Sequence, residues 1–273
     1  MCGRTKRETG QRSHRACSIS GTVTEIRHAL ERGGSAEHAK GVQWFFKEEI
    51  KSHGWYTAPL RRLAAAYRRR FQKEVGIEFL VDVADRLFTG RVLEEKIFAV
   101  LLLEGLSCQL RAQHFDLFES WLDRVNSWAD HDGLVHYLIA PMILAQPARI
   151  EKVFKWAKSP DHWHRRAACV ALIQSTRKGK QFHAIVRLAN MLLTDEDDMV
   201  QKGLGWLLRE TAKGEQKRTL SFLLKIRDRA PRLVLRTACE TLPQAAKRKV
   251  LGSSKQRSLK YRGFNAAPSA SRI

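Results

Sequence analysis

Three short segments of the sequence carry side chains whose chemistry suits a binding or catalytic site. NSWADHDGL holds Trp128 and Asp132 four residues apart, SPDHWHRRAACV holds Arg166, and DDMVQKGLGWLLRE holds Trp206. A carboxylate stabilises positive charge that develops nearby, an indole face attracts cations, and a guanidinium binds phosphate through two parallel hydrogen bonds. Side chains of these types can therefore carry binding or catalytic chemistry.

Each of these residues also has a purely structural interpretation. Asp132 alone would more often be a helix cap, and Arg166 alone would be the partner in a surface ion pair. A tryptophan on an apolar helix usually belongs to the core. We assign four other tryptophans to the core: Trp44, Trp55, Trp121 and Trp156.

The segment around Trp206 is an unusual helix because it contains Gly203 and Gly205. Each glycine costs about 1 kcal/mol relative to alanine in a helix interior. The flanking cations Lys202 and Arg209 suggest contact with an anion. The glycines would allow an anionic partner or a neighbouring helix to approach closely, and close helix packing alone would explain them as well.

The elements that must position these residues are helices. Capping residues and Gly, Pro, Asp or Ser breaks punctuate the chain from about residue 21 to 250, and strand alternation is nearly absent. The predicted helices cover residues 22–34, 35–54, 57–74, 90–106, 114–127, 132–145, 147–158, 161–176, 180–193, 197–213, 215–229 and 231–241.

These helices recur in pairs with a period of about 35–40 residues, which is typical of HEAT-type repeats. Asp132 lies 34 residues before Arg166, and Arg166 lies 40 before Trp206. Positions one repeat apart stack on the same surface of a solenoid. We therefore expect an all-α, HEAT-like helical-repeat solenoid whose concave, basic face gathers these side chains; a plain helical bundle is the alternative.

The charge balance points to a polyanionic partner. The chain of 273 residues has 49 Lys and Arg against 28 Asp and Glu, a formal net charge of +21, while 44% hydrophobic residues provide a core. Nucleic acid and an anionic membrane are the usual partners of such a protein. A ribosome-associated or generally basic protein is the alternative.

Cysteines and chain ends add little chemistry. The five cysteines lack zinc-ligand spacing, and Cys108, Cys169 and Cys239 resemble buried small hydrophobes, which suits a reducing compartment. No apolar run is long enough to span a membrane. We expect a disordered basic arm at residues 1–20, with a transit peptide as the alternative, a folded domain at 21–250 and a disordered basic tail at 251–273.

The sequence resembles the AlkD family of alkylpurine DNA glycosylases over residues 35–250. WHRRAA is similar to the family's Trp-x-x-Arg-x-Ala segment, and QKGLGWLLRE is similar to its most specific segment, around a second tryptophan. QWFFKEEIKSHGWYTAPLRRLA is similar to its early Phe-Phe-Lys stretch. The sequence departs from the family pattern at Asp130, which adds a second carboxylate, at Gly133, and at TAPL in place of Thr-Pro.

The resemblance implies specific roles. Asp132 would be the catalytic carboxylate, Trp128 and Trp206 the paired tryptophans beside the sugar, and Arg166 a phosphate clamp. Further DNA-binding candidates are Lys202, Arg209, Arg165, Arg61 and Arg62. The family implies a shallow aromatic cleft rather than a deep pocket for a flipped base.

The resemblance thus implies a monofunctional glycosylase that excises cationic alkylpurines such as 7-methylguanine and 3-methyladenine. We expect a monomer that acts on double-stranded DNA in the cytoplasm, at the nucleoid, with no metal, cofactor or membrane. The alternatives are a non-catalytic protein that binds branched or distorted DNA on the same fold, and a helical scaffold for a protein partner, against which the charge of +21 argues.

Overall fold

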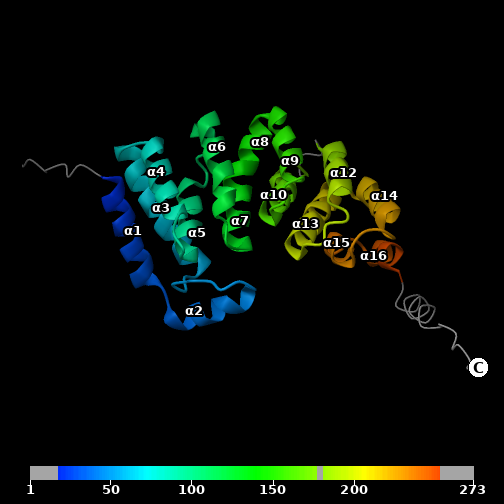
Figure 1. The fold of residues 1–273 in the computed structure, drawn as a ribbon, viewed down its shortest axis with the longest axis horizontal. Helices are drawn as coiled ribbons and strands as arrows, with labels where there is room; N and C mark the ends of the chain where they lie inside the picture. Colours follow the sequence, from blue (N-terminus) through cyan, green and yellow to red (C-terminus); the bar gives the residue numbers. More distant parts are fainter. Residues whose placement is uncertain (1–17, 177–180, 253–273) are drawn as a thin grey trace, which may run out of the picture. The chain divides into compact units, whose positions relative to one another are not determined.

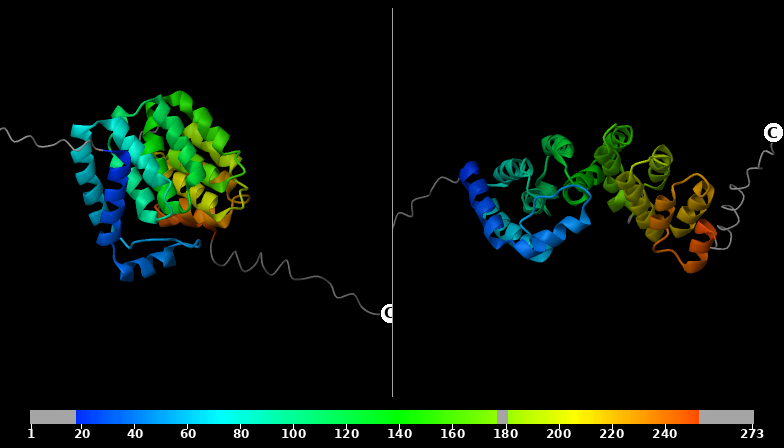
Figure 2. Two further views of the ribbon diagram at one scale, coloured as in Figure 1. Left: turned by 60° about the vertical axis from the view of Figure 1, so that its left-hand side comes forward. Right: turned by 60° about the horizontal axis from the view of Figure 1, so that its bottom comes forward.

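The computed structural model describes residues 18–176 and 181–252, and this part of the chain is built from helices (Figures 1 and 2). Its only β-type pairing is an isolated parallel bridge between Lys51 and Val92. The prediction of an all-α helical-repeat protein is confirmed. The prediction of a concave basic face stays a prediction, and the terminal arm up to residue 17 and the tail from residue 253 lie outside the described residues.

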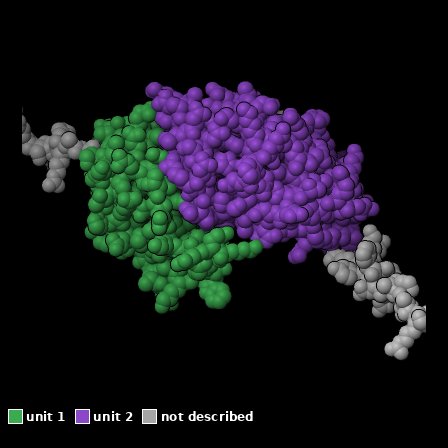
Figure 3. Space-filling model, in the orientation of Figure 1, with its two compact units in different colours: residues 1–102 green, residues 103–273 purple. Residues whose placement is uncertain are grey.

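The chain divides into two compact units, residues 1–102 and 103–273 (Figure 3). The helices of the first unit are α1 (Ile19–Gly33), α2 (Ala36–Val42), η1 (Gln43–Phe45), α3 (Thr57–Glu74), α4 (Ile77–Phe88) and α5 (Leu93–Leu103). The last residue of α5, Leu103, belongs to the second unit. Ser18 caps α1 by accepting a hydrogen bond from Gly21 N, so helix begins before residue 21, the expected start of the folded domain.

The predicted helix at residues 35–54 is wrong beyond its first two turns. The α-helix ends at Val42, and the side chain of Gln43 holds the following loop through bonds to Glu48 O (2.8 Å) and from Ile50 N (2.9 Å). Trp44 lies in η1, directly before this loop, and is 90% exposed, which contradicts its assignment to the core. Local side-chain bonds here replace the helical ladder.

The remaining core assignments have mixed outcomes. Trp121 and Trp156 are buried, as predicted, while Trp55 is half-buried and donates from Nε1 to Leu30 O (2.6 Å). Cys108 is exposed because it lies in a 3₁₀ turn after α5 and not inside an apolar helix, whereas Cys169 is buried as expected.

The second unit contains the remaining helices, of which η4 is a π-helical turn. They are η2 (Ser107–Gln109), α6 (Ala112–Trp121), η3 (Leu122–Arg124), α7 (Trp128–Leu134), η4 (Val135–Ile139), α8 (Ala140–Ala145), η5 (Pro147–Arg149), α9 (Ile150–Trp156), α10 (His162–Ala171), α11 (Ile173–Thr176), α12 (Phe182–Met191), α13 (Asp198–Gly214), α14 (Gln216–Ile226), α15 (Arg232–Ala238) and α16 (Gln244–Leu251). The helices α4 and α16 were absent from the sequence prediction.

Four helices of the second unit form a continuous row. Helix α7 contacts α10, α10 contacts α13, and α13 contacts α15 (Figure 1). The helices α9, α12 and α14 each pack against one member of this row. This arrangement places successive repeats side by side, so residues on equivalent turns of α7, α10 and α13 face one surface.

Candidate active site

The start of α7 is fixed by a capping box. Asp130 accepts hydrogen bonds from Ser127 N (2.8 Å), Ser127 Oγ (2.6 Å) and Asn126 N (3.0 Å), and it is 1% exposed. Such reciprocal bonds satisfy N–H groups that the first turn of a helix leaves open. The second carboxylate of this segment therefore has a structural role, and it orients the turn that carries Asp132.

Asp132 and Arg166 meet across α7 and α10. Arg166 Nε donates to Asp132 Oδ1 (2.9 Å) and Nη2 donates to Oδ2 (2.7 Å), a bidentate pair. The Arg166 side chain is 7% exposed and that of Asp132 is 18% exposed. Of the four side chains predicted from the repeat spacing to converge, Asp132 and Arg166 are thus in direct contact, and this carboxylate reaches the surface only in part.

A histidine that the sequence did not single out completes the cluster. His131 is fully buried, and its Nδ1 lies 2.7 Å from Asp132 Oδ1 while its Nε2 lies 3.0 Å from Trp163 O. Its ring also packs at 5.3 Å from the Trp163 ring. The only sequence signal was its position directly before Asp132, because the histidines show no catalytic or metal-binding spacing.

The carboxylate is held in its ionised form. Burial by itself raises the pKa of Asp132, but the Arg166 guanidinium and the hydrogen bonds from His131 and Arg166 outweigh it and lower the pKa to about 2. A carboxylate of such a low pKa is a weak base. Asp132 is therefore suited to act through its charge and its lone pairs and not by removing a proton.

The two glycines of α13 have separate roles. Arg166 Nη1 donates to Met199 O (2.5 Å), and a Cβ added to Gly203 would lie 3.3 Å from Arg166 Cγ, so Gly203 leaves room for the guanidinium. A Cβ on Gly205 would lie 2.6 Å from Thr237 Cβ. Gly205 therefore allows α13 and α15 to pack closely, which settles the question the sequence left open.

The two tryptophans lie on the same row of helices. Trp128 opens α7 and Trp206 lies in the middle of α13, and both are half-buried. The Trp206 ring is nearly parallel to the ring of His136 on η4, with an interplanar angle of 19° and 6.4 Å between centroids. His136 therefore packs against Trp206.

The predicted DNA-binding cations differ in their surroundings. Arg165 pairs with Asp195 (2.6 Å) and also donates to Ser159 O and Pro160 O. Arg209 pairs with Glu210 and Glu240. These two side chains are held by the protein, so their predicted phosphate contacts would require the release of an ion pair.

Lys202 is less constrained than Arg165 and Arg209. Lys202 is half-buried on α13 and forms no ion pair within the described part of the chain. Arg61 and Arg62 lie on α3 of the other unit, where Arg62 is exposed. Lys202 is thus the candidate of the second unit that is most available to a phosphate.

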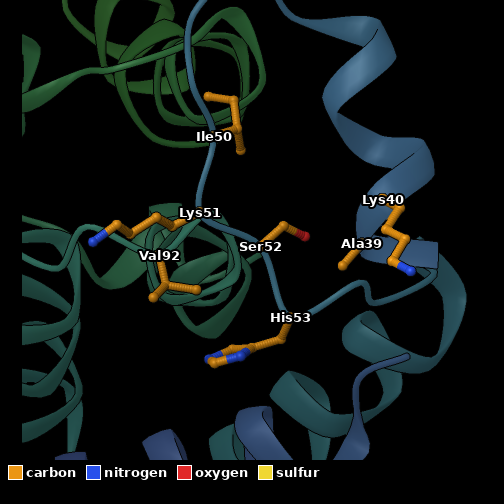
Figure 4. A pocket seen from close by; sticks show the side chains of 7 residues that line it. All are labelled: Ala39, Lys40, Ile50, Lys51, Ser52, His53 and Val92. Atoms are coloured by element: carbon orange, nitrogen blue, oxygen red, sulfur yellow. The ribbon is translucent and has the colours of Figure 1, made fainter. Parts of the chain in front are cut away.

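A separate pocket of about 480 Å³ lies in the first unit between α2 and the loop that follows η1 (Figure 4). Its lining includes Lys40, Lys51 and His53, and the loop beneath is held by the Glu94 carboxylate, which accepts from Ser52 Oγ (2.6 Å). None of the residues assigned to the site lines this pocket, so it contributes nothing to the Asp132 cluster.

Residues 26–242 match the model of the DNA alkylation repair enzyme family. The chain belongs to this family. The match covers the whole row from α7 to α15 and thus includes Asp132, Arg166 and Trp206. It agrees with the resemblance that the sequence motifs indicate.

Solved structures of DNA alkylation repair proteins share the fold. A predicted DNA alkylation repair enzyme from Enterococcus faecalis superposes with a TM-score of 0.69 at 14% identity, covering 77% of this chain and 97% of that one. AlkD2 from Streptococcus mutans superposes with a TM-score of 0.57 at 18% identity, covering 82% and 99%. No curated protein matches the sequence.

Two further features bear on the class of site. No helix within residues 18–176 and 181–252 has the length and apolar character that a membrane span requires. Across the same residues, no cluster of three His, Cys, Asp or Glu side chains is arranged to hold a metal ion.

Proposed function

We propose that the protein is a DNA glycosylase that excises cationic alkylated purines, such as 7-methylguanine and 3-methyladenine, from double-stranded DNA. The observation that carries the proposal is the ionised carboxylate of Asp132, held by Arg166 on the row of helices that also carries Trp128 and Trp206. This combination provides negative charge, aromatic faces and a guanidinium for a cationic, phosphate-bearing substrate.

The reaction would be hydrolysis of the N-glycosidic bond. The bond from C1′ of the sugar to the purine nitrogen breaks, and its electron pair leaves with the base, which departs neutral because it was cationic. Water oxygen then bonds to C1′ and its proton passes to solvent. The sugar becomes positively charged as the bond breaks, and Asp132 would stabilise that charge.

The carboxylate retains acceptor capacity for this task. Oδ1 accepts from Arg166 Nε and His131 Nδ1, whereas Oδ2 accepts only from Arg166 Nη2 among the described residues. Each carboxylate oxygen has two lone pairs, so Oδ2 can still accept from the attacking water. A charge pair at 4 Å and an effective dielectric of 20 contributes about 4 kcal/mol at most, and the flanking cations reduce this gain.

The tryptophans and Arg166 would bind the rest of the nucleotide. Trp128 and Trp206 would flank the deoxyribose and contribute roughly 0.5–2 kcal/mol each through contact with the positive charge. Arg166 uses three of its five N–H groups on Asp132 and Met199 O, which leaves N–H groups for a backbone phosphate. Lys202 would add a second phosphate contact. No cofactor is required by this chemistry.

The decisive experiment compares wild type with D132N in single-turnover release of 7-methylguanine from a methylated duplex. We expect release by wild type and a loss of at least a hundredfold in D132N, while E119Q serves as the matched control. Glu119 also forms a partly buried pair, with Lys152 on α9, and neither residue is assigned to the proposed site.

Folding and binding must be measured for each variant, because D132N leaves Arg166 with no carboxylate partner. Melting temperature and affinity for undamaged duplex separate loss of chemistry from loss of structure. A wild-type protein that binds DNA but releases no base above the spontaneous rate would replace the glycosylase with a non-catalytic DNA-binding protein. Weak DNA binding as well would favour a scaffold for a protein partner.

A further inference from the structure

The surroundings of His131 determine where its ring protons lie. Its Nε2 faces Trp163 O at 3.0 Å, and a backbone carbonyl can only accept, so Nε2 carries a hydrogen. Its Nδ1 faces Asp132 Oδ1 at 2.7 Å, and an ionised carboxylate also only accepts. Both ring nitrogens must therefore donate, which describes an imidazolium and not either neutral tautomer.

The neighbouring charges are consistent with this form. The carboxylate of Asp132 lies against one edge of the ring through Oδ1, and the Arg166 guanidinium bonds both oxygens of the same carboxylate. The Trp163 carbonyl faces the other edge, and the Trp163 indole packs beside the ring. One partly exposed carboxylate thus bonds two cations, and loss of either bond would leave its charge less well compensated.

We propose that His131 is a positioning residue for Asp132: a buried imidazolium that is anchored through Nε2 to α10 and holds the carboxylate through Nδ1. The proposal rests on the proposed function for its effect on rate, but the ring state can be measured independently. His131 is fully buried and Asp132 is partly exposed, so the histidine acts through the carboxylate and does not touch the substrate.

The division of labour with Arg166 follows from the geometry. His131 has no further N–H to offer, because its two ring nitrogens are both used inside the protein. Arg166 retains N–H groups that a phosphate can accept from. When DNA binds, the guanidinium would turn towards the phosphate, and one side of Asp132 would lose this partner. His131 would then keep the carboxylate in place while the guanidinium serves the phosphate.

Two substitutions separate the two bonds. H131N places its amide nitrogen near the position of Nδ1 and keeps a donor for Asp132, whereas H131Q places its amide nitrogen near Nε2 and keeps only the bond to Trp163 O. Partners that orient the ligands of metal sites typically contribute 10- to 100-fold, and we expect an effect of the same order for a partner that orients a catalytic carboxylate. We expect both variants to be slower than wild type in single-turnover base release, and H131Q to be at least tenfold slower than H131N.

H114N is the matched control for replacing a buried histidine with asparagine. His114 is 3% exposed on α6 and its Nδ1 accepts from Arg111 N, a capping role outside the site. H114N should release the base at the wild-type rate. Equal rates for H131N and H131Q, whether both normal or both lost, would overturn the positioning role.

Nitrogen-15 NMR of the histidine rings at neutral pH tests the protonation state, with H131N used to assign the signals of His131. Two protonated ring nitrogens support the imidazolium, and a neutral tautomer with one protonated nitrogen overturns it. Absence of base release by wild type would overturn the proposed function and the positioning role together, while the NMR result would still decide the state of the ring.

Discussion

The chemistry of single residues here depends on which partner each one keeps. Asp130 and Asp132 are two positions apart. Asp130 caps α7 and is buried, whereas Asp132 pairs with Arg166 and stays partly exposed. Composition cannot distinguish them, because both are aspartates on the first turns of the same helix. The distinction arises from the side of the helix that each one occupies.

The lowered pKa of Asp132 gives a prediction about acid stability. A carboxylate with a pKa of about 3.9 unfolded and about 2 folded stabilises the protein above pH ~4, and this contribution is lost as the pH falls towards 2. It corresponds to roughly 2–3 kcal/mol. In urea unfolding, the difference in free energy of unfolding between wild type and D132N should therefore be constant above pH ~4 and shrink below it. A difference that persists unchanged to pH 2.5 would contradict the ion pair.

At the scale of elements, a row of neighbouring helices sets the distance between catalytic candidates. The contact of α10 with α13 depends on Gly203, and that of α13 with α15 depends on Gly205. The intrinsic cost of two glycines in one helix is therefore offset by packing that larger residues would prevent. The two positions should respond differently to the same substitution.

We expect G205A to reduce stability by about 1–2 kcal/mol, because overpacking against Thr237 and Val234 O outweighs the gain in helix propensity of about 1 kcal/mol. G203A meets its nearest neighbour, Arg166 Cγ, at 3.3 Å and should change stability less while lowering base release by shifting the guanidinium. Urea unfolding and single-turnover kinetics on both variants measure this. A larger loss of stability in G203A and a larger loss of base release in G205A would contradict the roles assigned to the two glycines.

For the whole molecule, the net charge of +21 favours DNA over a protein partner, but only some cations are available to phosphates. Arg165 and Arg209 already pair with carboxylates, whereas Lys202 forms no ion pair with residues 18–176 or 181–252. Net charge thus describes long-range attraction, and the ion pairs of the folded chain determine which side chains make contacts.

Salt dependence of DNA binding tests this distinction. The logarithm of affinity for a duplex should fall linearly with the logarithm of salt concentration, by about 0.9 per phosphate neutralised. K202A should lower the magnitude of this slope by about one, and K217A on α14 is a control of equal charge change. A slope in K202A equal to that of K217A would remove Lys202 from the interface.

The sequence alone was sufficient for the helical class and for the expectation that Asp132 and Arg166 converge, because period and motif are local properties that repeat stacking converts into proximity. It did not predict that these two side chains pair directly. It also did not predict the end of α2 at Val42 or the exposure of Trp44, since side-chain bonds such as those of Gln43 compete with helix propensity. The helix α4 was missed as well. The sequence also missed His131. Only the tertiary structure brings Trp163 O and Asp132 to opposite edges of that ring, because the two acceptors lie on different helices and a hydrogen bond between helices leaves no mark in the spacing of residues along the chain.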